Sequence, residues 1–357
     1  MENTVPEEKK KKKRGCLIVI LILLFLLIGG LVAGSIFISS MLGKIEREEE
    51  VIETLSQEEI DQILNETEPE DMEIILETTV DGETVAEEVE EETISTEPVE
   101  VIQNGDKIIN IMLVGQDTYS TKKRSRTDTM ILCTVNKETK TVTLTSFMRD
   151  LYVDIPGYKD QRLNVPYLLG GFKKLYQTLE KNFGVKVEHG IAVNFNSFPK
   201  VIDAVGGVDI ELTKAEAKHL NKKFDSWELV AGVNHLNGEQ ALQYSRIRKI
   251  DSDYARTKRQ RKVLKEVLTK AKTMPVTELY DLVNTLIPLV KTDMTDAEII
   301  NTAIELIPLL PDLEIKTQRI PINGEYKSTT VKGMAVLVPD KKANRQFLED
   351  TIGDPND

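Results

Sequence analysis

Residues 107–146 read KIINIMLVGQDTYSTKKRSRTDTMILCTVNKETKTVTLTS, and this stretch decides the fold. The apolar run at 108–114 is rich in Ile and closed by Gly115, which predicts a β-strand. Two more strands are expected at 129–135 and 141–146, on either side of a short polar turn. Three strands so close in the sequence favour one β-sheet at the start of a folded domain.

Strand and helix patterns alternate through the rest of the chain. Strands are also expected at 191–194, 208–212 and 313–320. Helices are expected at 171–183, 198–205, 254–272, 276–290 and 295–307. This interleaving predicts an α/β domain at 107–350, with a mixed central β-sheet flanked by α-helices on both faces, and a C-terminal tail at 351–357.

The N-terminal region has the pattern of a membrane anchor. Residues 9–14 are all basic, and 17–38 is apolar apart from glycines and Ser35. At about 1.5 Å per residue such a helix spans roughly 30 Å, the thickness of a bilayer core. A secretory signal peptide shares these features but usually has a shorter apolar run and a small-residue cleavage site. We therefore expect a transmembrane helix at 17–38, a short basic cytoplasmic tail at 1–16, and the rest of the chain outside the cell.

Acidic and basic residues are segregated along the chain. The net charge is −13, but 27 acidic residues face 8 basic ones up to Asp106, whereas 38 basic residues outnumber 32 acidic ones from Lys107 onward. The segment 39–106 is predicted to be an acidic extracytoplasmic linker, partly helical or disordered. The mildly basic domain permits an anionic ligand. Few aromatic residues and no zinc-binding spacing argue against nucleic acid as a partner.

Two aspartates flank the loop between the first two strands. Asp117 follows the first strand and Asp128 precedes the second, so both carboxylates should lie at one edge of the sheet, where α/β proteins commonly bind ligands. With Arg126 between them, they suit a divalent cation that holds phosphate oxygens. Loop capping by the aspartates is the alternative. Arg149, beside Asp150, is a further candidate after the third strand, although such a dipeptide is also common as a surface ion pair.

Basic residues concentrate at 241–261, ALQYSRIRKIDSDYARTKRQR. Arg246 and Arg248 are two apart and would share one side of an extended segment. Arg256 and Gln260 are four apart and would share one face of a helix. Because arginine presents a planar fork of donors, these pairs suit bidentate binding of phosphate. A solvated basic helix face is the alternative interpretation.

An ordered series of motifs resembles the LytR-CpsA-Psr family of cell-envelope phosphotransferases. The motifs are NIMLVGQD, SRTDTMIL, SFMRDLYVDIPG, RLNVPYLLGG, NFNSFPKVIDAVGGVDIEL, LNGEQALQYSRIRK and DYARTKRQR. They lie within 108–272, and the family also has a single N-terminal membrane anchor. The resemblance implies transfer of a glycopolymer, such as teichoic acid or capsule, from a polyprenyl pyrophosphate carrier onto peptidoglycan through a phosphodiester link. It places the catalytic domain outside the cell membrane, as in a Gram-positive envelope.

The resemblance also implies roles for single residues. The catalytic set is Asp117, Arg126, Asp128 and Arg149. The pyrophosphate-binding set is Arg126, Arg149, Arg246, Arg248, Arg256 and Gln260. Asp117 and Asp128 match the family's metal-associated aspartates, with Mg²⁺ or Mn²⁺ as the cofactor, and Asp117 is either the catalytic base or only a metal ligand. One departure is Tyr119, where many members carry an arginine.

The polyprenyl chain of such a substrate needs an apolar binding site. Apolar helices that could form a long groove against the sheet are expected at 171–183, 263–271, 279–290 and 297–310. The other basic residues of the 241–261 stretch are expected at the surface: Lys249, Lys258, Arg259 and Arg261. Cys133 is expected to be a buried core thiol.

Two other functions are compatible with the same residues. A polyprenyl-pyrophosphate phosphohydrolase would use the same site with water as the acceptor. A non-catalytic envelope sensor or regulator is the second alternative, although a cytoplasmic part of about 16 residues without a DNA-binding motif makes direct control of transcription physically implausible.

Overall fold

The computed structural model describes residues 43–44, 46–47, 55–65, 99–103, 105–119, 124–224 and 226–353. The chain divides into two compact units, Met1–Ile45 and Glu46–Asp357, and the fold below is that of the second unit. The predicted cytoplasmic tail and transmembrane helix lie outside the described residues, as do most of the predicted linker and the last four residues. Within the described ranges, no helix is both long and apolar enough to cross a membrane.

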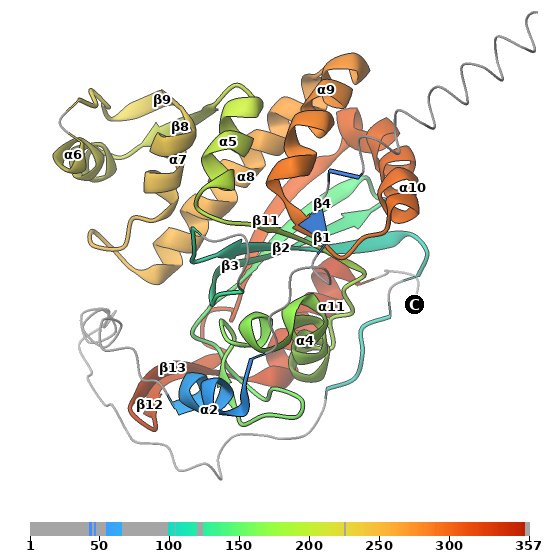
Figure 1. The fold of residues 1–357 in the computed structure, drawn as a ribbon, viewed down its shortest axis with the longest axis vertical. Coiled ribbons are helices and arrows are strands. Elements are labelled where there is room, and N and C mark those ends of the chain that lie inside the picture. The colour runs from blue at the N-terminus through green and yellow to red at the C-terminus, as the bar shows by residue number, and fades with distance from the viewer. Residues whose placement is uncertain are drawn as a thin grey trace, which may run out of the picture. The chain divides into compact units, whose positions relative to one another are not determined.

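A seven-stranded mixed β-sheet forms the centre of this unit, in the order β1-β10-β7-β2-β3-β4-β11 (Figure 1). Its strands are β1 (Glu46–Arg47), β2 (Ile108–Gln116), β3 (Thr127–Asn136), β4 (Thr141–Phe147), β7 (His189–Val193), β10 (Lys291–Thr292) and β11 (Glu314–Ile320). Consecutive strands β2, β3 and β4 are antiparallel, whereas β7 pairs in parallel with β2 and β11 pairs in parallel with β4. The predicted mixed sheet is confirmed, and five of its strands were expected from the sequence.

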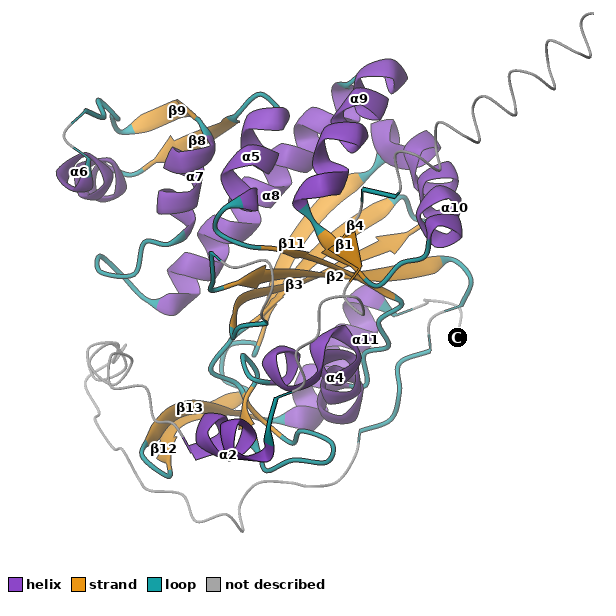
Figure 2. Ribbon diagram, viewed as in Figure 1, coloured by secondary structure: helices purple, strands orange, loops and turns teal. Residues whose placement is uncertain are grey.

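Helices cover both faces of this sheet, as predicted (Figure 2). The helices are α2 (Gln57–Asn65), α4 (Pro166–Phe183), α5 (Ser197–Ala204), α6 (Lys214–Lys223), α7 (Gly238–Ser245), α8 (Asp253–Thr273), α9 (Val276–Leu286), α10 (Asp296–Leu306), η3 (Ile287–Leu289), η4 (Ile307–Asp312) and α11 (Lys341–Ile352). Helices α4 and α11 pack on the face that carries Leu132, whereas α8 and η4 pack on the face that carries Ile131. Adjacent residues of β3 serve opposite faces because side chains alternate along a strand.

The two faces differ in how completely they are covered. On the α4 side, Met112 and Leu132 have no exposed surface. On the α8 side, Leu113, Cys133 and Ile191 are only partly buried. Cys133 still packs against the core, as expected, and burial raises the pKa of its thiol. The α8 side is therefore an apolar face with incomplete cover over β2 and β7, although Ile131 and Leu144 of the neighbouring strands are buried.

The prediction of the lipid groove is wrong for one of its four helices. The helix expected at 171–183 is the second part of α4, which follows non-helical Gly170 and Gly171. It packs on the fully covered face, and Figure 2 shows α8, α9 and α10 on the other side of the sheet. It cannot line one groove with them, because the sheet lies between.

A smaller lobe extends beyond the central sheet. The strand expected at 208–212 is confirmed as β8 (Val208–Leu212), but it pairs with β9 (Gly232–Leu236) in a separate two-stranded sheet. Its apolar side chains share a second core with α7 and with Val263 of α8. The sequence patterns had not predicted β9, α6 or α7.

Part of the predicted linker belongs to the folded unit. The strand β1 pairs in parallel with β10 at the edge of the central sheet. Helix α2 packs Ile60, Ile63 and Leu64 against the core on the α4 side, and Gln161 Nε2 donates a hydrogen bond to the Leu64 carbonyl at 3.2 Å.

Two further strand pairs lie outside the central sheet. They are β5 (Tyr152–Val153) with β6 (Gln161–Arg162), and β12 (Tyr326–Val331) with β13 (Met334–Pro339). An isolated bridge joins Leu151 to Leu337. This contact brings the segment after β4 next to β13.

Candidate active site

The two predicted aspartates lie at one edge of the central sheet. Strand β2 runs antiparallel to β3, so its end meets the start of β3, and the Asp117 amide donates to the Arg126 carbonyl at 3.1 Å. Asp128 is the second residue of β3. The expectation that both carboxylates share one edge is confirmed.

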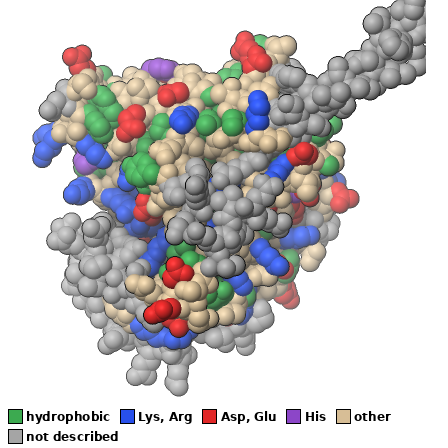
Figure 3. All heavy atoms as spheres, viewed as in Figure 1, with side chains coloured by type: hydrophobic (Ala, Val, Ile, Leu, Met, Phe, Trp, Pro, Cys, Tyr) green, Lys and Arg blue, Asp and Glu red, His purple; other side chains and the backbone are tan. Residues whose placement is uncertain are grey.

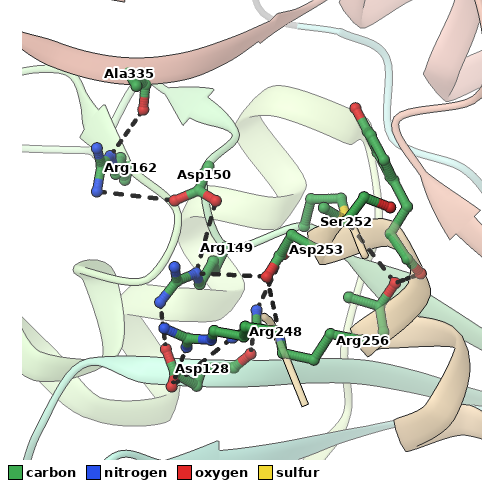
Figure 4. Close-up of polar contacts among 12 residues, drawn as sticks. Asp128, Arg149, Asp150, Arg162, Arg248, Ser252, Asp253, Arg256 and Ala335 are labelled. Carbon is green, nitrogen blue, oxygen red and sulfur yellow. Dashed lines mark hydrogen bonds and ion pairs between the residues drawn. The ribbon is translucent and has the colours of Figure 1, made fainter. Parts of the chain in front are cut away.

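Asp128 lies among three arginine side chains (Figure 4). Arg149 Nη1 donates to Asp128 Oδ1 at 2.9 Å, and Arg248 Nη2 donates to Asp128 Oδ2 at 2.7 Å. Arg256 Nη2 donates to the Asp128 carbonyl at 3.3 Å, and its Nη1 lies 3.8 Å from Oδ2. One carboxylate thus holds arginines from the β4 end, the α7–α8 loop and α8.

A second set of acidic residues fixes the same arginines from the other side. Asp253, at the start of α8, lies 2.9 Å from Arg256 Nε and 4.0 Å from Arg149 Nε. Asp150 lies 3.6 Å from Arg149 Nε and 3.8 Å from Arg162 Nη1. Sequence reasoning gave no ligand role to Asp253, Asp150 or Arg162. The sequence pattern gave little indication of a site there, because Asp253 is typical of a helix cap and Asp150 of a surface ion pair.

The pKa values of the two aspartates are shifted in opposite directions. Burial alone would raise the pKa of Asp128, but the ion pairs with Arg149, Arg256 and Arg248 lower it from 3.8 to about 2. The pKa of Asp117 is raised, first because protein surrounds part of its carboxyl and then because Asp128 is close. Asp117 makes no hydrogen bond or ion pair through its side chain to another described residue, and it remains exposed to solvent.

Arg246 and Arg248 do not lie in an extended segment, so that prediction is wrong. Helix α7 ends at Ser245, Arg246 is its C-terminal cap, and Arg248 lies in the loop before α8. The guanidinium of Arg246 stacks on the Phe195 ring at 4.1 Å, and the Phe195 ring lies 5.2 Å from that of Tyr119. This loop still brings both arginines to the aspartates.

Arg256 and Gln260 lie on α8, as predicted, but they are not equally accessible. The Arg256 side chain is only 2% exposed and is held by Asp128 and Asp253. Gln260 is partly buried, and its Oε1 is enclosed without a hydrogen-bond partner. Arg126 is also partly buried, just before β3. Arg256 therefore positions Asp128, whereas Gln260 has an unused acceptor.

Two arginines expected at the surface are buried. Arg259 is 4% exposed and Arg261 is 7% exposed. Arg259 Nε donates to Glu216 Oε1 at 2.7 Å, and Arg259 Nη2 pairs with Asp251. Glu216 lies on α6, far away in the sequence, so no local pattern could have indicated this pair. Lys249 and Lys258 are exposed, as predicted.

The aspartate pair fits a metal ion only together with a phosphate ligand. No group of three or more His, Cys, Asp or Glu side chains among the described residues could hold a metal by itself. Both oxygens of Asp128 already accept arginine hydrogen bonds, whereas the Asp117 carboxylate accepts none from the other described residues. Mg²⁺ commonly uses one or two carboxylates and completes its shell with phosphate oxygens and water. The donor set suits such a shared site, with Asp117 as the main ligand.

Comparisons with known proteins identify the family of this chain. The model of the LytR_cpsA_psr family matches residues 76–352. The regulatory protein MsrR of Staphylococcus aureus is 31% identical over 259 residues, which cover 70% of this chain and 76% of MsrR. The polyisoprenyl-teichoic acid–peptidoglycan teichoic acid transferase TagU of Enterococcus faecalis is 33% identical over 198 residues, which cover 54% of this chain and 63% of TagU.

A solved structure of TagT bound to LIIa-WTA has the same architecture. It aligns with a TM-score of 0.58 at 25% identity and covers 72% of this chain and 94% of TagT. The family model alone matches well over half of the chain. The chain belongs to the LytR_cpsA_psr family.

Proposed function

We propose that this protein transfers a glycopolymer from a polyprenyl pyrophosphate carrier onto peptidoglycan, from an anchored position on the outer side of the cell membrane. The observation that carries the proposal is the arginine cluster around Asp128, which adjoins an apolar face with incomplete cover. A charged diphosphate joined to a long hydrocarbon chain requires this combination of surfaces. TagU is named as a teichoic acid transferase, which supports the same reaction class.

The arginines divide into two groups according to their exposure. Arg246 is exposed and the Arg248 side chain is 28% exposed, so these two would make the first contacts with an incoming diphosphate. Arg149 and Arg256 are 6% and 2% exposed and hold Asp128 in place. Arginines fixed in this way stabilise developing phosphate charge without reorganising during the reaction. Arg126 and Gln260 are proposed to complete the diphosphate site.

The charge of the surface favours the approach of an anionic substrate. Helix α6 carries four lysines. In Figure 3, Lys and Arg side chains gather over and below this helix, on the left of the face drawn. A basic surface raises the local concentration of a polyanion and its rate of association.

Asp117 is proposed to act at the reacting phosphate, as the ligand of Mg²⁺ or Mn²⁺ or as the base. A divalent cation held by Asp117, with Asp128 beside it, would neutralise charge on the phosphate oxygens. The exposed carboxylate of Asp117 can otherwise take the proton of the attacking sugar hydroxyl, and its raised pKa suits that role. The hydroxyl oxygen forms a bond to the polymer-linked phosphorus. The bond from that phosphorus to the bridging oxygen breaks, and polyprenyl phosphate leaves.

The polyprenyl chain is proposed to bind on the α8 side of the sheet. Leu113 and Cys133 of the central strands are partly buried there. The helix residues that face them are also only partly buried: Leu264, Leu268, Leu306, Leu309 and Leu310. A bound hydrocarbon chain would complete the burial of these side chains, at about 25 cal/mol per Å² of apolar area.

The decisive experiment is a transfer assay. Full-length protein in nanodiscs is mixed with lipid-linked glycopolymer, peptidoglycan and Mg²⁺, and polymer bound to peptidoglycan is measured by mass spectrometry after muramidase digestion. We expect a coupled product and released polyprenyl phosphate. Free phosphorylated glycan without coupling would instead show a phosphohydrolase. No reaction with any donor, while TagU reacts in parallel, would overturn the proposal.

A regulatory role is kept as the second candidate because MsrR is named a regulatory protein. The same site would then sense a lipid-linked glycan instead of transferring it. An Arg248→Met strain separates the two roles. Unchanged wall glycopolymer together with altered expression of envelope genes would favour regulation.

A further inference from the structure

We propose a second oxyanion-binding site, formed by Arg261 of α8 and Arg319 of β11 beneath the helix and separate from the Asp128 cluster. Its ligand class is a phosphate or carboxylate group. Only the identity of the biological ligand rests on the proposed function. That ligand would be a phosphate of the glycopolymer or a carboxylate of the peptidoglycan stem peptide.

Among the residues that the structure describes, Arg261 is a buried cation without an acidic partner. It is 7% exposed, and its Nε and Nη1 atoms are enclosed with no hydrogen-bond partner. Arg259, two residues earlier, is buried to a similar degree but contacts Glu216 and Asp251. A buried, uncompensated charge is costly, whereas a paired one largely offsets its desolvation. A buried arginine on α8 can therefore be paired with carboxylates, as Arg259 is. Among the described residues, Arg261 has no such carboxylate partner.

Arg319 provides a second cation, whose charge acts on Arg261. Its hydrogen-bond acceptors are neutral, the Pro321 carbonyl at 2.6 Å and the Asn323 side chain, and its guanidinium lies 4.2 Å above the Tyr254 ring. Burial and then the charge of Arg319 lower the pKa of Arg261 from 12.5 to about 10, and no carboxylate acts on it. Without an anion between them, the like charges of these two guanidinium groups oppose each other.

The strands below provide a polar partner. Arg319 is in register with Ser146 of β4. Neighbouring Gln318 contacts Thr145 and Thr351, on the α11 side. Because side chains alternate along a strand, Arg319 and Ser146 point to the α8 side. The Ser146 hydroxyl is enclosed without a hydrogen-bond partner, so it can donate to an oxyanion there.

The proposed site is distinct from the Asp128 cluster. Arg261 follows Arg256 by five residues, which turns its side chain by about 140° around the helix axis. Arg256 faces Asp128 at the start of β3, whereas Arg261 faces Arg319 on β11, beyond β4. The two sites therefore lie at different positions around one helix, over different strands of the sheet.

The test measures ligand-dependent thermal stability and requires no transfer activity. Full-length protein carrying Arg246→Met and Arg248→Met, to weaken the first site, is melted in nanodiscs with increasing inorganic phosphate or acetate. We expect phosphate at ten times its Kd to raise the Tm by about 3 °C. Adding Arg261→Met should abolish this rise and, without phosphate, should increase the Tm because it removes the uncompensated charge.

Arg259→Met is the matched control on the same helix. It should lower the Tm, since Glu216 and Asp251 lose their partner, and it should retain the response to phosphate. Arg319→Met is the second variant if Arg261→Met does not fold, and it should also abolish the response. A response to acetate as well as phosphate would assign the site to oxyanions in general, and a response to phosphate alone would assign it to phosphate.

A phosphate response that survives both Arg261→Met and Arg319→Met would overturn this proposal. So would a loss of stability in Arg261→Met as large as that in Arg259→Met, because it would reveal a partner within the protein. Either result leaves the transfer assay untouched, so failure of this site and failure of the proposed function remain distinguishable.

Discussion

The two ends of the candidate site are built in opposite ways. At the Asp128 end, three arginines from distant segments surround one carboxylate, and the pKa of Asp128 falls to about 2. At the Asp117 end, the carboxylate is exposed and the nearby Tyr119 is 62% exposed. We infer that the closed end positions charged groups, whereas the open end is available to a ligand. Four experiments test this difference between the two ends.

Asp128→Ala should have the largest effect. Arg149, Arg248 and Arg256 would lose their shared partner, and breaking such a buried ion pair costs about 3–5 kcal/mol. Urea denaturation of the full-length protein should show this loss, and transfer should disappear with it. Asp209→Ala is the control, because Asp209 pairs with His235 at an exposed position. A loss below about 1 kcal/mol in Asp128→Ala would contradict the structural role of this end.

Asp117→Asn should separate activity from stability. We expect transfer to fall by about 10²- to 10⁴-fold, because the proposed metal ligand or base is removed. Urea denaturation should show equal or slightly higher stability at neutral pH, since the raised pKa of Asp117 means that its ionised form is disfavoured in the fold. A rise in Tm caused by Mn²⁺ in the wild-type protein should be absent from this variant. Retention of both the metal response and transfer would remove Asp117 from the site.

The pH dependence of stability should have opposite signs at the two ends. The pKa of Asp128 is depressed from 3.8 to about 2, so it stabilises the fold above pH 3.8, and this contribution, on the order of 2 kcal/mol, is lost as the pH falls through 2. The pKa of Asp117 is raised, so its ionisation reduces stability as the pH increases above 3.8. The free energy of unfolding, plotted from pH 2 to 7, should rise less steeply below pH 3.8 in Asp128→Asn and should fall less just above pH 3.8 in Asp117→Asn. If both variants showed the same dependence of stability on pH, the opposite pKa shifts of Asp128 and Asp117 would be contradicted.

Tyr119→Arg should have the smallest effect. It introduces the residue that many family members carry at this position and adds a cation to the open end. Because the contact would be exposed, we expect the KM for the lipid-linked donor to fall by at most about fivefold, with kcat unchanged. Stability should stay within about 0.5 kcal/mol, since surface substitutions seldom do more. Tyr119→Phe is the control that keeps the ring, and an equal change in KM there would rule out the charge as the cause.

The central strands could be predicted because their pattern is local. Residues 108–114 and 129–135 are short apolar runs closed by polar turns. Such runs predict strands from the local sequence, whichever position the strand takes in the sheet. The placement of Asp117 and Asp128 at one edge follows from the antiparallel pairing of β2 with β3. Short elements such as β10 and β1 could not be predicted, because two residues carry no periodicity.

The stretch 241–261 shows where prediction from a pattern ends. Its helix, α8, was expected within one residue at each end, because helical spacing and the cap at Ser252 are local features. The extended segment expected at Arg246 and Arg248 is instead a helix end and a loop, since α7 continues to Ser245. The spacing of two arginines does not specify the backbone that carries them.

The core strands, the family and the candidate phosphate-binding residues could all be predicted from sequence patterns. Which of these charges are compensated became visible only in the folded molecule. Arg259 meets Glu216 from another helix, Arg149 and Arg248 meet at Asp128, and Arg261 meets no carboxylate among the described residues. The physical reason is that the cost of a buried charge depends on its neighbours in space, and residues distant in the chain supply those neighbours.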